Sequence, residues 1–270
     1  HFEDHAPRLA SEALLKACDL ASIKPSGIDA LLVCTCTGYL CPGLSSYISE
    51  RLGLRPNAFL QDLLGLGCGA ALPLLETARG FLAANPDATV ATIAVEISSA
   101  AFYLNDEPGV LISLCLFGDG AAAAIWKAES QGGQLRFQNF RTIHQPEHRE
   151  KIRFVNAGGR LKNQLHREVP ELAAKAVSQL YQMSSNAPRK IIAHTGGRDV
   201  IDAIERAIPG QKLSATREIL RQYGNISSPS VLAALEHSLA TSPHAESLWL
   251  TAFGAGFAAH SGELVASQDV

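Results

Sequence analysis

The feature that most constrains the fold of this 270-residue chain is a strand-and-helix pattern that occurs twice. The apolar run at 31–35 resembles the run at 191–195. Gly67-Cys68 before one apolar helical segment resembles Gly224-Asn225 before another. Apolar runs that are bounded by turn residues and alternate with helical patterns are typical of helices and sheets packed in layers. We therefore predict an α/β protein of two duplicated βαβαβ halves that bring Cys68 and Asn225 together.

The elements of each half can be placed from hydrophobic periodicity. In the first half we expect a helix before the turn at 22–27, strands at 30–36, 58–63 and 89–96, and helices at 44–52 and 69–84. In the second half we expect strands at 190–194 and 247–253, and helices at 169–183, 199–208, 215–222 and 229–240. Strand–helix–strand spacing favours parallel sheets, and 129–156 is interpreted as a polar connection. The predicted domains are 1–128 and 129–270.

Composition excludes several classes of protein. The chain is 47% hydrophobic and 18% charged, carries a formal net charge of −3 and has no run of lysine or arginine. Nucleic-acid binding and anionic-membrane binding therefore have no electrostatic basis. No apolar stretch approaches the roughly 18 residues of a membrane span, and no signal-peptide pattern is present. We expect a cytoplasmic protein whose six cysteines are free thiols.

Cys68 lies between two glycines, immediately before an apolar helical run. Unpaired N–H groups and the positive end of a helix dipole favour the thiolate, which is the nucleophilic form of cysteine. The flanking glycines leave room for an electrophile to approach. A small cysteine that merely packs at a strand–helix junction is the alternative. The motif predicts that Cys68 is a nucleophile, and the alternative that this cysteine only packs in the core stays open.

Two further polar residues occupy comparable positions. His194 follows an apolar strand and precedes two glycines, where open α/β sheets place ligand-contacting groups. Asn225 precedes a helix in Gly-Asn-Ile-Ser-Ser. The alternatives are a core histidine and an ordinary helix N-cap. A cysteine, an imidazole and a neutral amide together suit acyl transfer, because the imidazole lowers the thiol pKa and the N–H groups stabilise an enolate or oxyanion.

Five segments resemble, in order, motifs of the type III polyketide synthases, the chalcone-synthase-like branch of the thiolase-fold condensing enzymes. They are Leu-Gly-Cys-Gly-Ala at 66–70, Leu-Phe-Gly-Asp-Gly-Ala-Ala-Ala at 116–123, Ile-Ala-His-Thr-Gly-Gly at 192–197, Tyr-Gly-Asn-Ile-Ser-Ser at 223–228 and Phe-Gly-Ala-Gly at 253–256. The resemblance implies a thiolase-like fold layered αβαβα, and a homodimer. The sequence begins at His1 within an amphipathic helical pattern, so we expect the family's N-terminal elements to be missing.

The resemblance also implies an activity. The chain would be an acyltransferase that condenses malonyl-CoA, with loss of carbon dioxide, onto an acyl-CoA starter carried by Cys68. His194 and Asn225 would complete the catalytic set by polarising the malonyl thioester. The substrates are coenzyme A thioesters, and no metal or organic cofactor is expected. Small residues at positions that resemble cavity-lining ones suggest a long-chain fatty acyl starter and products of the pyrone or resorcinol type: Cys36, Cys41, Ser98 and Ala101.

Other substrate contacts follow from the same resemblance. Phe117 matches a gatekeeper phenylalanine, and a second gatekeeper aromatic corresponds to Asn163 or Leu161. Asp199 stands at the position of a phosphate-binding lysine, with Arg198 beside it as a substitute for binding phosphate. The remaining predicted contacts are Gly196, Gly197, Ser227, Gly254 and Gly256.

Two alternative functions stay open. One is a β-ketoacyl-[acyl-carrier-protein] synthase of the initiating type, and the other is a catalytically inactive thiolase-fold subunit. The double glycine after His194 favours the polyketide synthase over the first, and retention of all three catalytic residue types argues against the second. Cys34, Cys36 and Cys41 lack a second cluster with metal-ligand spacing, so we predict no zinc site and place Cys34 and Cys36 on one face of a strand, lining a pocket. His144 is interpreted as part of a solvated loop.

Overall fold

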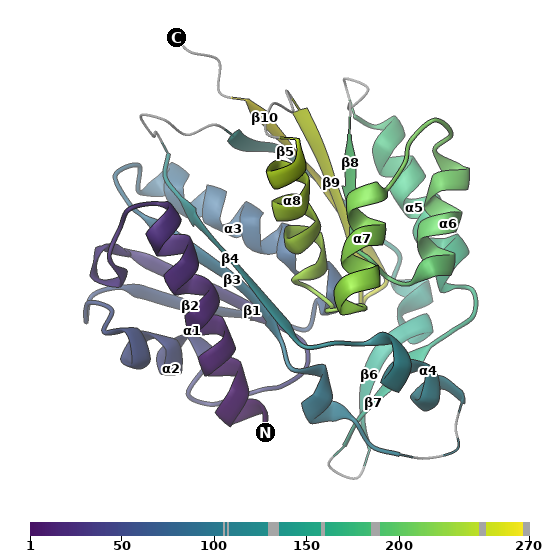
Figure 1. Cartoon of the computed structure of the whole chain (residues 1–270), viewed down its shortest axis with the longest axis horizontal. Helices are drawn as coiled ribbons and strands as arrows, with labels where there is room; N and C mark the ends of the chain where they lie inside the picture. Colours follow the sequence, from purple (N-terminus) through teal and green to yellow (C-terminus); the bar gives the residue numbers. More distant parts are fainter. Residues whose placement is uncertain are drawn as a thin grey trace.

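The computed structural model describes residues 1–104, 106, 108–128, 135–157, 160–184, 190–242 and 247–266, without the side chains of 108, 156, 157, 160 and 161. Two four-stranded sheets dominate the described chain, with helices on their faces (Figure 1). None of the described helices is long and apolar enough to cross a membrane.

The first sheet has the order β2-β1-β3-β4. Its strands are β1 (Ala30–Thr35), β2 (Phe59–Leu64), β3 (Val90–Glu96) and β4 (Gly120–Trp126). β1 pairs in parallel with β2 and β3, whereas β4 runs antiparallel to β3. β1 and β3 are buried along their whole length, which explains their unbroken apolar sequences. The outer face is covered by α1 (Phe2–Leu20) and α2 (Leu44–Leu52).

The second sheet has the order β5-β10-β9-β8. Its strands are β5 (Leu135–His144), β8 (Ile191–Ala193), β9 (Ser247–Gly254) and β10 (Ala258–Ala266). β8 and β9 are parallel, and β10 is antiparallel to both β9 and β5. On one face, α5 (Val169–Gln182) and α6 (Arg198–Ala207) pack around the buried Trp249 and Phe253.

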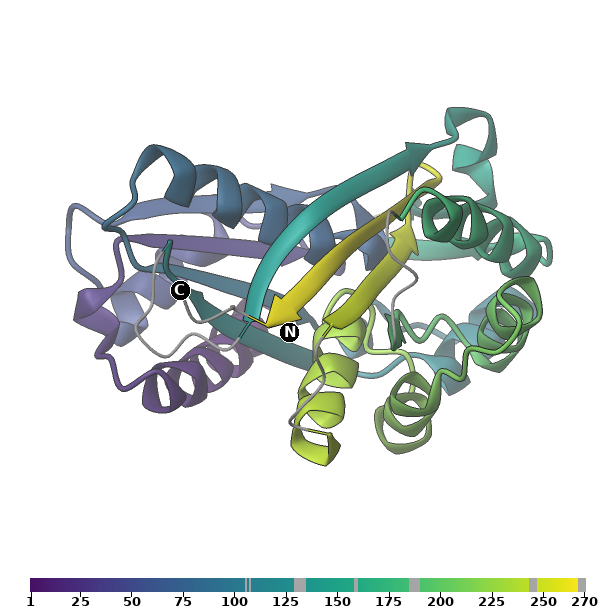
Figure 2. The same cartoon turned by 90° about the horizontal axis from the view of Figure 1, so that it is seen from above.

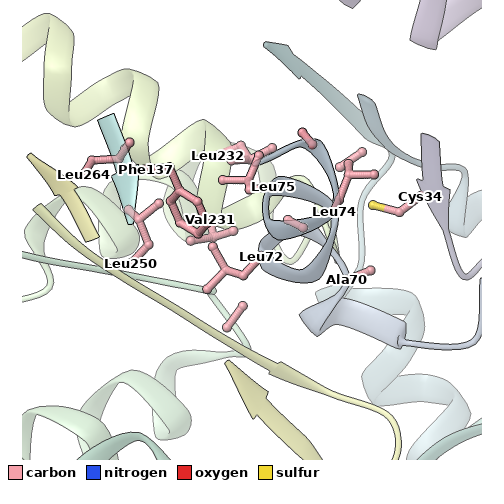
Figure 3. Close-up of a cluster of buried hydrophobic side chains, with 14 of the residues drawn as sticks. Cys34, Ala70, Leu72, Leu74, Leu75, Phe137, Val231, Leu232, Leu250 and Leu264 are labelled. Carbon is pink, nitrogen blue, oxygen red and sulfur yellow. The ribbon is translucent and has the colours of Figure 1, made fainter. Parts of the chain in front are cut away.

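A helical layer lies between the two sheets. It contains α3 (Ala71–Ala84) and α8 (Ser230–Thr241), with α7 (Ser214–Tyr223) packed beside α8. Leu74 of α3 points toward Cys34 of β1, and Leu72 points toward Leu250 of β9 (Figure 3). From above, α3 lies between the purple strands of the first sheet and the yellow strands of the second (Figure 2). A helix packed between two sheets has to be largely apolar, and α3 is apolar apart from Glu76, Thr77 and Arg79, none of which is buried.

A smaller unit stands at one end of the second sheet. It consists of α4 (Pro108–Leu116) and the two-stranded hairpin of β6 (Ile152–Ala157) and β7 (Arg160–Leu165), which lie together in Figure 1. Four short 3-10 turns complete the described elements: η1 (Pro25–Gly27), η2 (Gly67–Gly69), η3 (Ser98–Ala101) and η4 (Pro146–Lys151).

The predicted helices and strands are confirmed to within a few residues, and so is the αβαβα layering. Two predictions are wrong. The sheets are mixed rather than parallel, and the supposed polar connection contains β5 and β6. β5 was hidden because a bulge at Asn139, whose φ is 54°, breaks the alternation of apolar and polar residues. The domain boundary stays a prediction, since residue 129 lies outside the described residues.

Candidate active site

Cys68 lies in the η2 turn that leads into α3, with 7% of its surface exposed. The backbone of this turn packs against Gly254, the last residue of β9. A Cβ at Gly254 would lie 2.5 Å from the Gly69 nitrogen and 2.7 Å from the Leu66 oxygen, so only glycine allows this approach. Gly254 therefore allows close packing of the turn that holds the cysteine, and its contact with substrate stays a prediction.

His194 directly follows β8, where its backbone nitrogen donates to the Thr251 carbonyl at 2.8 Å. The imidazole is 1% exposed and meets the Phe253 ring edge to face, with the ring centroids 5.1 Å apart. Its Nδ1 has no hydrogen-bond partner among the described residues. After His194 the chain turns at Gly196, whose φ is 56° and whose added Cβ would lie 2.9 Å from Phe253. The ring is thus held by packing and keeps hydrogen-bonding capacity.

Asn225 is fixed at both its backbone and its side chain. Its nitrogen donates to the Leu116 carbonyl at 2.8 Å, and its carbonyl accepts from Gly118 at 3.1 Å. The side-chain Oδ1 accepts from the Ser227 nitrogen at 2.9 Å, and Nδ2 donates to the Gly196 carbonyl at 3.1 Å. An amide nitrogen carries two hydrogens, so one remains for a ligand. The N-cap interpretation is wrong, because the N-cap of α8 is Pro229.

Cys68, His194 and Asn225 line one cavity of about 1050 Å³. The predicted convergence of these three side chains is therefore confirmed, while their catalytic roles stay a prediction. Four of the predicted substrate contacts line the same cavity: Phe117, Gly196, Gly197 and Arg198. Volumes of this order are typical of pockets that enclose most of a small-molecule ligand.

Ser227 connects the nucleophile to a buried carboxylate. Its hydroxyl lies 3.2 Å from Cys68 Sγ, 3.4 Å from Cys36 Sγ and 3.3 Å from Glu96 Oε1. A hydroxyl has one hydrogen, so Ser227 donates to one of these acceptors at a time. The φ of Ser227 is 57°, an unusual value for a residue other than glycine, and the loop around Asn225 holds it there.

Glu96 is a functional candidate that the sequence analysis missed. It is fully buried, and its Oε2 accepts from Cys36 N, Thr37 N, Thr35 Oγ1 and Thr37 Oγ1 at 2.9–3.2 Å. Its Oε1 accepts from Ser228 Oγ at 2.6 Å and from Ser227 Oγ. These bonds tie the ends of β1 and β3 to the Ser227 loop. The signal in the sequence that could have identified Glu96 is its position as a charged residue at the end of the apolar run of β3.

Burial opposes charge on both reactive groups. It raises the pKa of the Cys68 thiol to about 12, with a smaller opposing contribution from the Ser227 hydrogen bond and a further increase from Glu96. Burial lowers the pKa of His194 to about 3, partly offset by the Ser227 backbone. Desolvation of the thiol therefore opposes the bias toward the thiolate that the sequence predicts from the helix end. The sulfur needs a proton acceptor inside the cavity. Two histidines line it with Cys68, and His194 is the buried one, whereas His166 is exposed.

Several predicted contacts lie elsewhere. Ser98 and Ala101 line a second, smaller cavity of about 30 Å³. Cys36 lies behind Cys68 against Ser227, and Cys41 is exposed on the loop between β1 and α2, so neither lines either cavity. Cys34 packs in the core against α3. Cys34 and Cys36 therefore do not line the common pocket that strand alternation had predicted, because Cys36 follows β1 and contacts Ser227.

Gly256 and Ser227 also line neither cavity, although Ala255 between the two C-terminal glycines does. His144 ends β5, where its Nε2 lies 3.2 Å from the Gly256 carbonyl. Among the described residues, no group of three histidine, cysteine or carboxylate side chains has the geometry to hold a metal ion. All six cysteines are free, as predicted.

The open end of the main cavity carries basic side chains. Arg198 pairs with Asp199 at 3.5 Å, but both side chains are about four-fifths exposed, so the pair is weak. Arg153, His166 and Arg167 line the same cavity and were not predicted from the sequence. Of the two positions proposed for a second gatekeeper, Asn163 lines both cavities, and the side chain of Leu161 lies outside the described residues.

Two family models match this chain. One, described as FAE1/type III polyketide synthase-like protein, matches residues 5–187. The other, described as the C-terminal domain of chalcone and stilbene synthases, matches residues 146–258.

Individual proteins show the same similarity. The 1,3,6,8-tetrahydroxynaphthalene synthase of Streptomyces griseus is 28% identical over 269 residues, which cover 96% of this chain and 72% of that protein. The 3-ketoacyl-CoA synthase 6 of Arabidopsis thaliana is 27% identical over 285 residues, covering 88% of this chain and 57% of that one. The crystal structure of the 1,3,6,8-tetrahydroxynaphthalene synthase of Streptomyces coelicolor superposes with a TM-score of 0.89 at 25% identity, covering 99% of this chain and 80% of that one.

Proposed function

Because this chain belongs to the FAE1/type III polyketide synthase-like family of condensing acyltransferases, we propose that it condenses malonyl-CoA with an acyl-CoA starter carried on Cys68. The observation that carries this proposal is the shared cavity of Cys68, His194 and Asn225. A thiol, an imidazole and an amide donor together supply a nucleophile, a proton acceptor and an oxyanion site. The substrates are coenzyme A thioesters.

In the loading step, His194 accepts the proton of the Cys68 thiol as the sulfur attacks the starter carbonyl. A carbon–sulfur bond to Cys68 forms, the bond to coenzyme A breaks, and the departing thiolate takes the proton from His194. Moving the proton within the pair leaves the net charge of the cavity unchanged, which matters because burial opposes an isolated thiolate. The Ser227 hydroxyl donates a hydrogen bond to the Cys68 sulfur and stabilises its negative charge during this step.

In the extension step, the malonyl thioester oxygen accepts hydrogen bonds from Asn225 Nδ2 and from the His194 ring. Carbon dioxide leaves, and the electron pair of the broken carbon–carbon bond forms an enolate. The enolate carbon attacks the acyl carbonyl on Cys68, a new carbon–carbon bond forms, and the sulfur departs. Hydrogen bonds already hold the Asn225 amide in place, so it does not have to reorient as negative charge develops on the thioester oxygen. Donors that are preorganised in this way are the source of electrostatic stabilisation in such sites. Reloading of the extended chain on Cys68 makes the process iterative.

The starter in this proposal is an aliphatic acyl chain, and the products are of the pyrone or resorcinol type. The support that remains for this part is the second cavity beside the first, which Ser98 and Ala101 line with mainly apolar neighbours. Cys36 and Cys41 line neither cavity.

We also infer a homodimer through the open edge of the first sheet. β2 is an edge strand, and its apolar side chains Phe59, Leu60 and Leu64 are 46%, 36% and 40% exposed. An exposed apolar edge strand is an unstable arrangement unless another strand or surface covers it.

The activity is tested by incubating the protein with radiolabelled malonyl-CoA and acetyl-, octanoyl-, dodecanoyl- or benzoyl-CoA. Labelled polyketide is expected with the aliphatic starters, and Cys68→Ala is expected to make none. A parallel reaction in which malonyl-[acyl-carrier-protein] replaces malonyl-CoA tests the alternative that the protein is a β-ketoacyl-[acyl-carrier-protein] synthase. Labelled product from Cys68→Ala would contradict the assigned nucleophile.

A further inference from the structure

Two cysteines contact the same hydroxyl group beside the candidate active site. Cys68 Sγ lies 3.2 Å from Ser227 Oγ, and Cys36 Sγ lies 3.4 Å from the same oxygen. Cys68 lines the substrate cavity, whereas Cys36 lines neither cavity. The proposed loading and extension steps use Cys68 and leave Cys36, a second thiol next to the nucleophile, without a role.

The topology of the first sheet explains why these two cysteines meet. β1 and β2 are parallel neighbours, and their last residues, Thr35 and Leu64, are paired. Cys36 is the first residue after β1, and Cys68 lies in the η2 turn that follows β2. Neighbouring strands of a sheet are about 4.8 Å apart, so segments that leave the same end of both strands start close together. The backbone therefore places both thiols beside the Ser227 loop.

Cys36 has a fixed backbone and a side chain that can turn. Its nitrogen donates to Glu96 Oε2 at 2.9 Å, and Glu96 is fully buried. The Cys36 sulfur contacts the Ser227 hydroxyl and the Glu96 carboxylate. Thiols form weak hydrogen bonds, so these contacts do not lock the side chain. Rotation about the Cα–Cβ bond of Cys36 moves its sulfur while the backbone stays in place.

The two thiols differ in reactivity. Cys68 lines an open cavity together with His194, its proposed proton acceptor, so a hydroperoxide that enters this cavity reaches an activated sulfur. Burial raises the pKa of the Cys36 thiol, and the nearby Glu96 raises it further. Oxidation of cysteines begins at the more accessible sulfur with more thiolate character. Cys68 is therefore the first of the two to be oxidised.

We propose that Cys36 protects the nucleophile from irreversible oxidation by forming a reversible disulfide bond with Cys68. Hydrogen peroxide first converts the Cys68 thiolate to a sulfenic acid: a sulfur–oxygen bond forms, the oxygen–oxygen bond breaks, and the departing hydroxide takes the proton held by His194. The Cys36 sulfur then attacks the Cys68 sulfur. A sulfur–sulfur bond forms, and hydroxide leaves Cys68 with the proton of the Cys36 thiol. The two thiols lose two electrons in total, and one hydrogen peroxide becomes two water molecules.

The disulfide bond gives an inactive state from which the enzyme recovers. Cys68 carries no acyl group while it is joined to Cys36, and a thiol reductant that enters the cavity restores both thiols by exchange. The Ser227 hydroxyl keeps Glu96 as an acceptor in this state. A sulfenic acid that meets no second thiol is oxidised further to a sulfinic acid, which thiols do not reduce. This inference rests on the proposed function only in that Cys68 is the reactive thiol.

The test treats the wild type and Cys36→Ser with hydrogen peroxide and maps the peptides by mass spectrometry without reduction. A Cys36–Cys68 disulfide peptide is expected in the wild type, and a Cys68 sulfinic acid, heavier by about 32 Da, in Cys36→Ser. Dithiothreitol should then return at least about fivefold more alkylatable Cys68 in the wild type than in Cys36→Ser. Cys36→Ala is the second variant should the serine variant fold poorly. Octanoyl transfer from octanoyl-CoA to Cys68 is measured before oxidation in every sample.

Cys41→Ser is the matched control, because it makes the same chemical change at an exposed cysteine that lines neither cavity. It should behave as the wild type does. A sulfinic acid on Cys68 with Cys36 still reduced in the oxidised wild type would overturn this inference, and so would a Cys68 that stays reduced while Cys41 is oxidised. Either result in a protein that loads octanoyl groups leaves the proposed function standing. The disulfide bond in a protein that loads none would support this inference and contradict the proposed function.

Discussion

The Ser227 hydroxyl lies 3.2 Å from the sulfur of Cys68 and joins two loops that are 159 positions apart in the sequence. The same hydroxyl reaches Glu96, so the nucleophile is connected to a buried carboxylate through one shared donor. A donor at the sulfur stabilises its charged form, and this bond lowers the Cys68 pKa against the larger effect of burial.

Ser227→Ala should therefore make Cys68 less reactive. Loss of one hydrogen bond to the developing thiolate is expected to slow both iodoacetamide alkylation and acyl loading by about fivefold to tenfold, corresponding to about 1 kcal/mol. Peptide mapping separates Cys68 from the exposed Cys41 and Cys115, which serve as internal controls. Alkylation of Cys68 at the wild-type rate would show that the bond does not act on the reactive sulfur.

His194→Ala should slow the alkylation of Cys68 more than Ser227→Ala does, because the thiol then loses the proton acceptor in its cavity. The decrease is expected to exceed about tenfold at pH 7.5, since a buried thiol without that acceptor stays protonated. The rate for Cys41, which is exposed and lines neither cavity, should not change. An unchanged Cys68 rate would mean that the two groups are not coupled.

Glu96→Ala is expected to destabilise the fold. It would leave buried donors from Thr35, Thr37 and the Cys36 backbone without an acceptor, at a cost of at least about 3 kcal/mol in unfolding free energy. Glu96→Gln keeps the shape and one acceptor oxygen and should retain more of the stability. Urea unfolding at pH 7.5 measures both variants, and equal stability of Glu96→Ala and the wild type contradicts the network.

Acid should destabilise the protein through two buried histidines. Burial lowers the pKa of His194 to about 3 and that of His260 to about 4, against an ordinary value near 6.5. Between these values and 6.5 the unfolded chain binds more protons than the folded one, so stability falls as the pH falls, by up to about 1.4 kcal/mol per pH unit for each histidine. Above about pH 6.5 both histidines are neutral in the folded and the unfolded chain, so they do not make the free energy of unfolding depend on pH.

His260→Phe should reduce this acid sensitivity, because it removes one of the two groups. His260 stacks on Phe140 and lies outside the substrate cavity, so a ring of similar shape fits its place. Unfolding free energies from urea titrations at pH 4.5, 5.5 and 7.5 measure how stability changes with pH. The same slope in His260→Phe and wild type would contradict the assignment to this histidine.

The β2 edge should mediate dimerisation. Leu60→Glu places a charge on the exposed edge and is expected to shift the protein toward monomer in sedimentation velocity. Leu20→Glu is the control, because Leu20 is 86% exposed at the end of α1 and lies on neither sheet. A wild-type monomer, or a Leu60→Glu dimer of unchanged stability, would contradict this interface.

The sequence predicted that Cys68, His194 and Asn225 share one cavity because each lies near the end of a regular element, next to or one residue from a glycine, and such ends converge in layered α/β folds. Glu96 escaped prediction for a physical reason. Its partners Ser227 and Ser228 are more than 130 positions away in the sequence, and local periodicity carries no information on them. Cys41 was misplaced because the chain leaves the sheet after β1 and follows an exposed loop.

The most direct test of the account is the site of the acyl-enzyme bond. The protein is mixed with octanoyl-CoA, quenched in acid and digested, and the acylated peptide is identified by mass spectrometry. We predict one octanoyl group on Cys68, none on Cys68→Ala, and an Asn225→Ala variant that loads but does not extend with malonyl-CoA. An octanoyl group on a different residue of the wild type, or loading of Cys68→Ala, would contradict it.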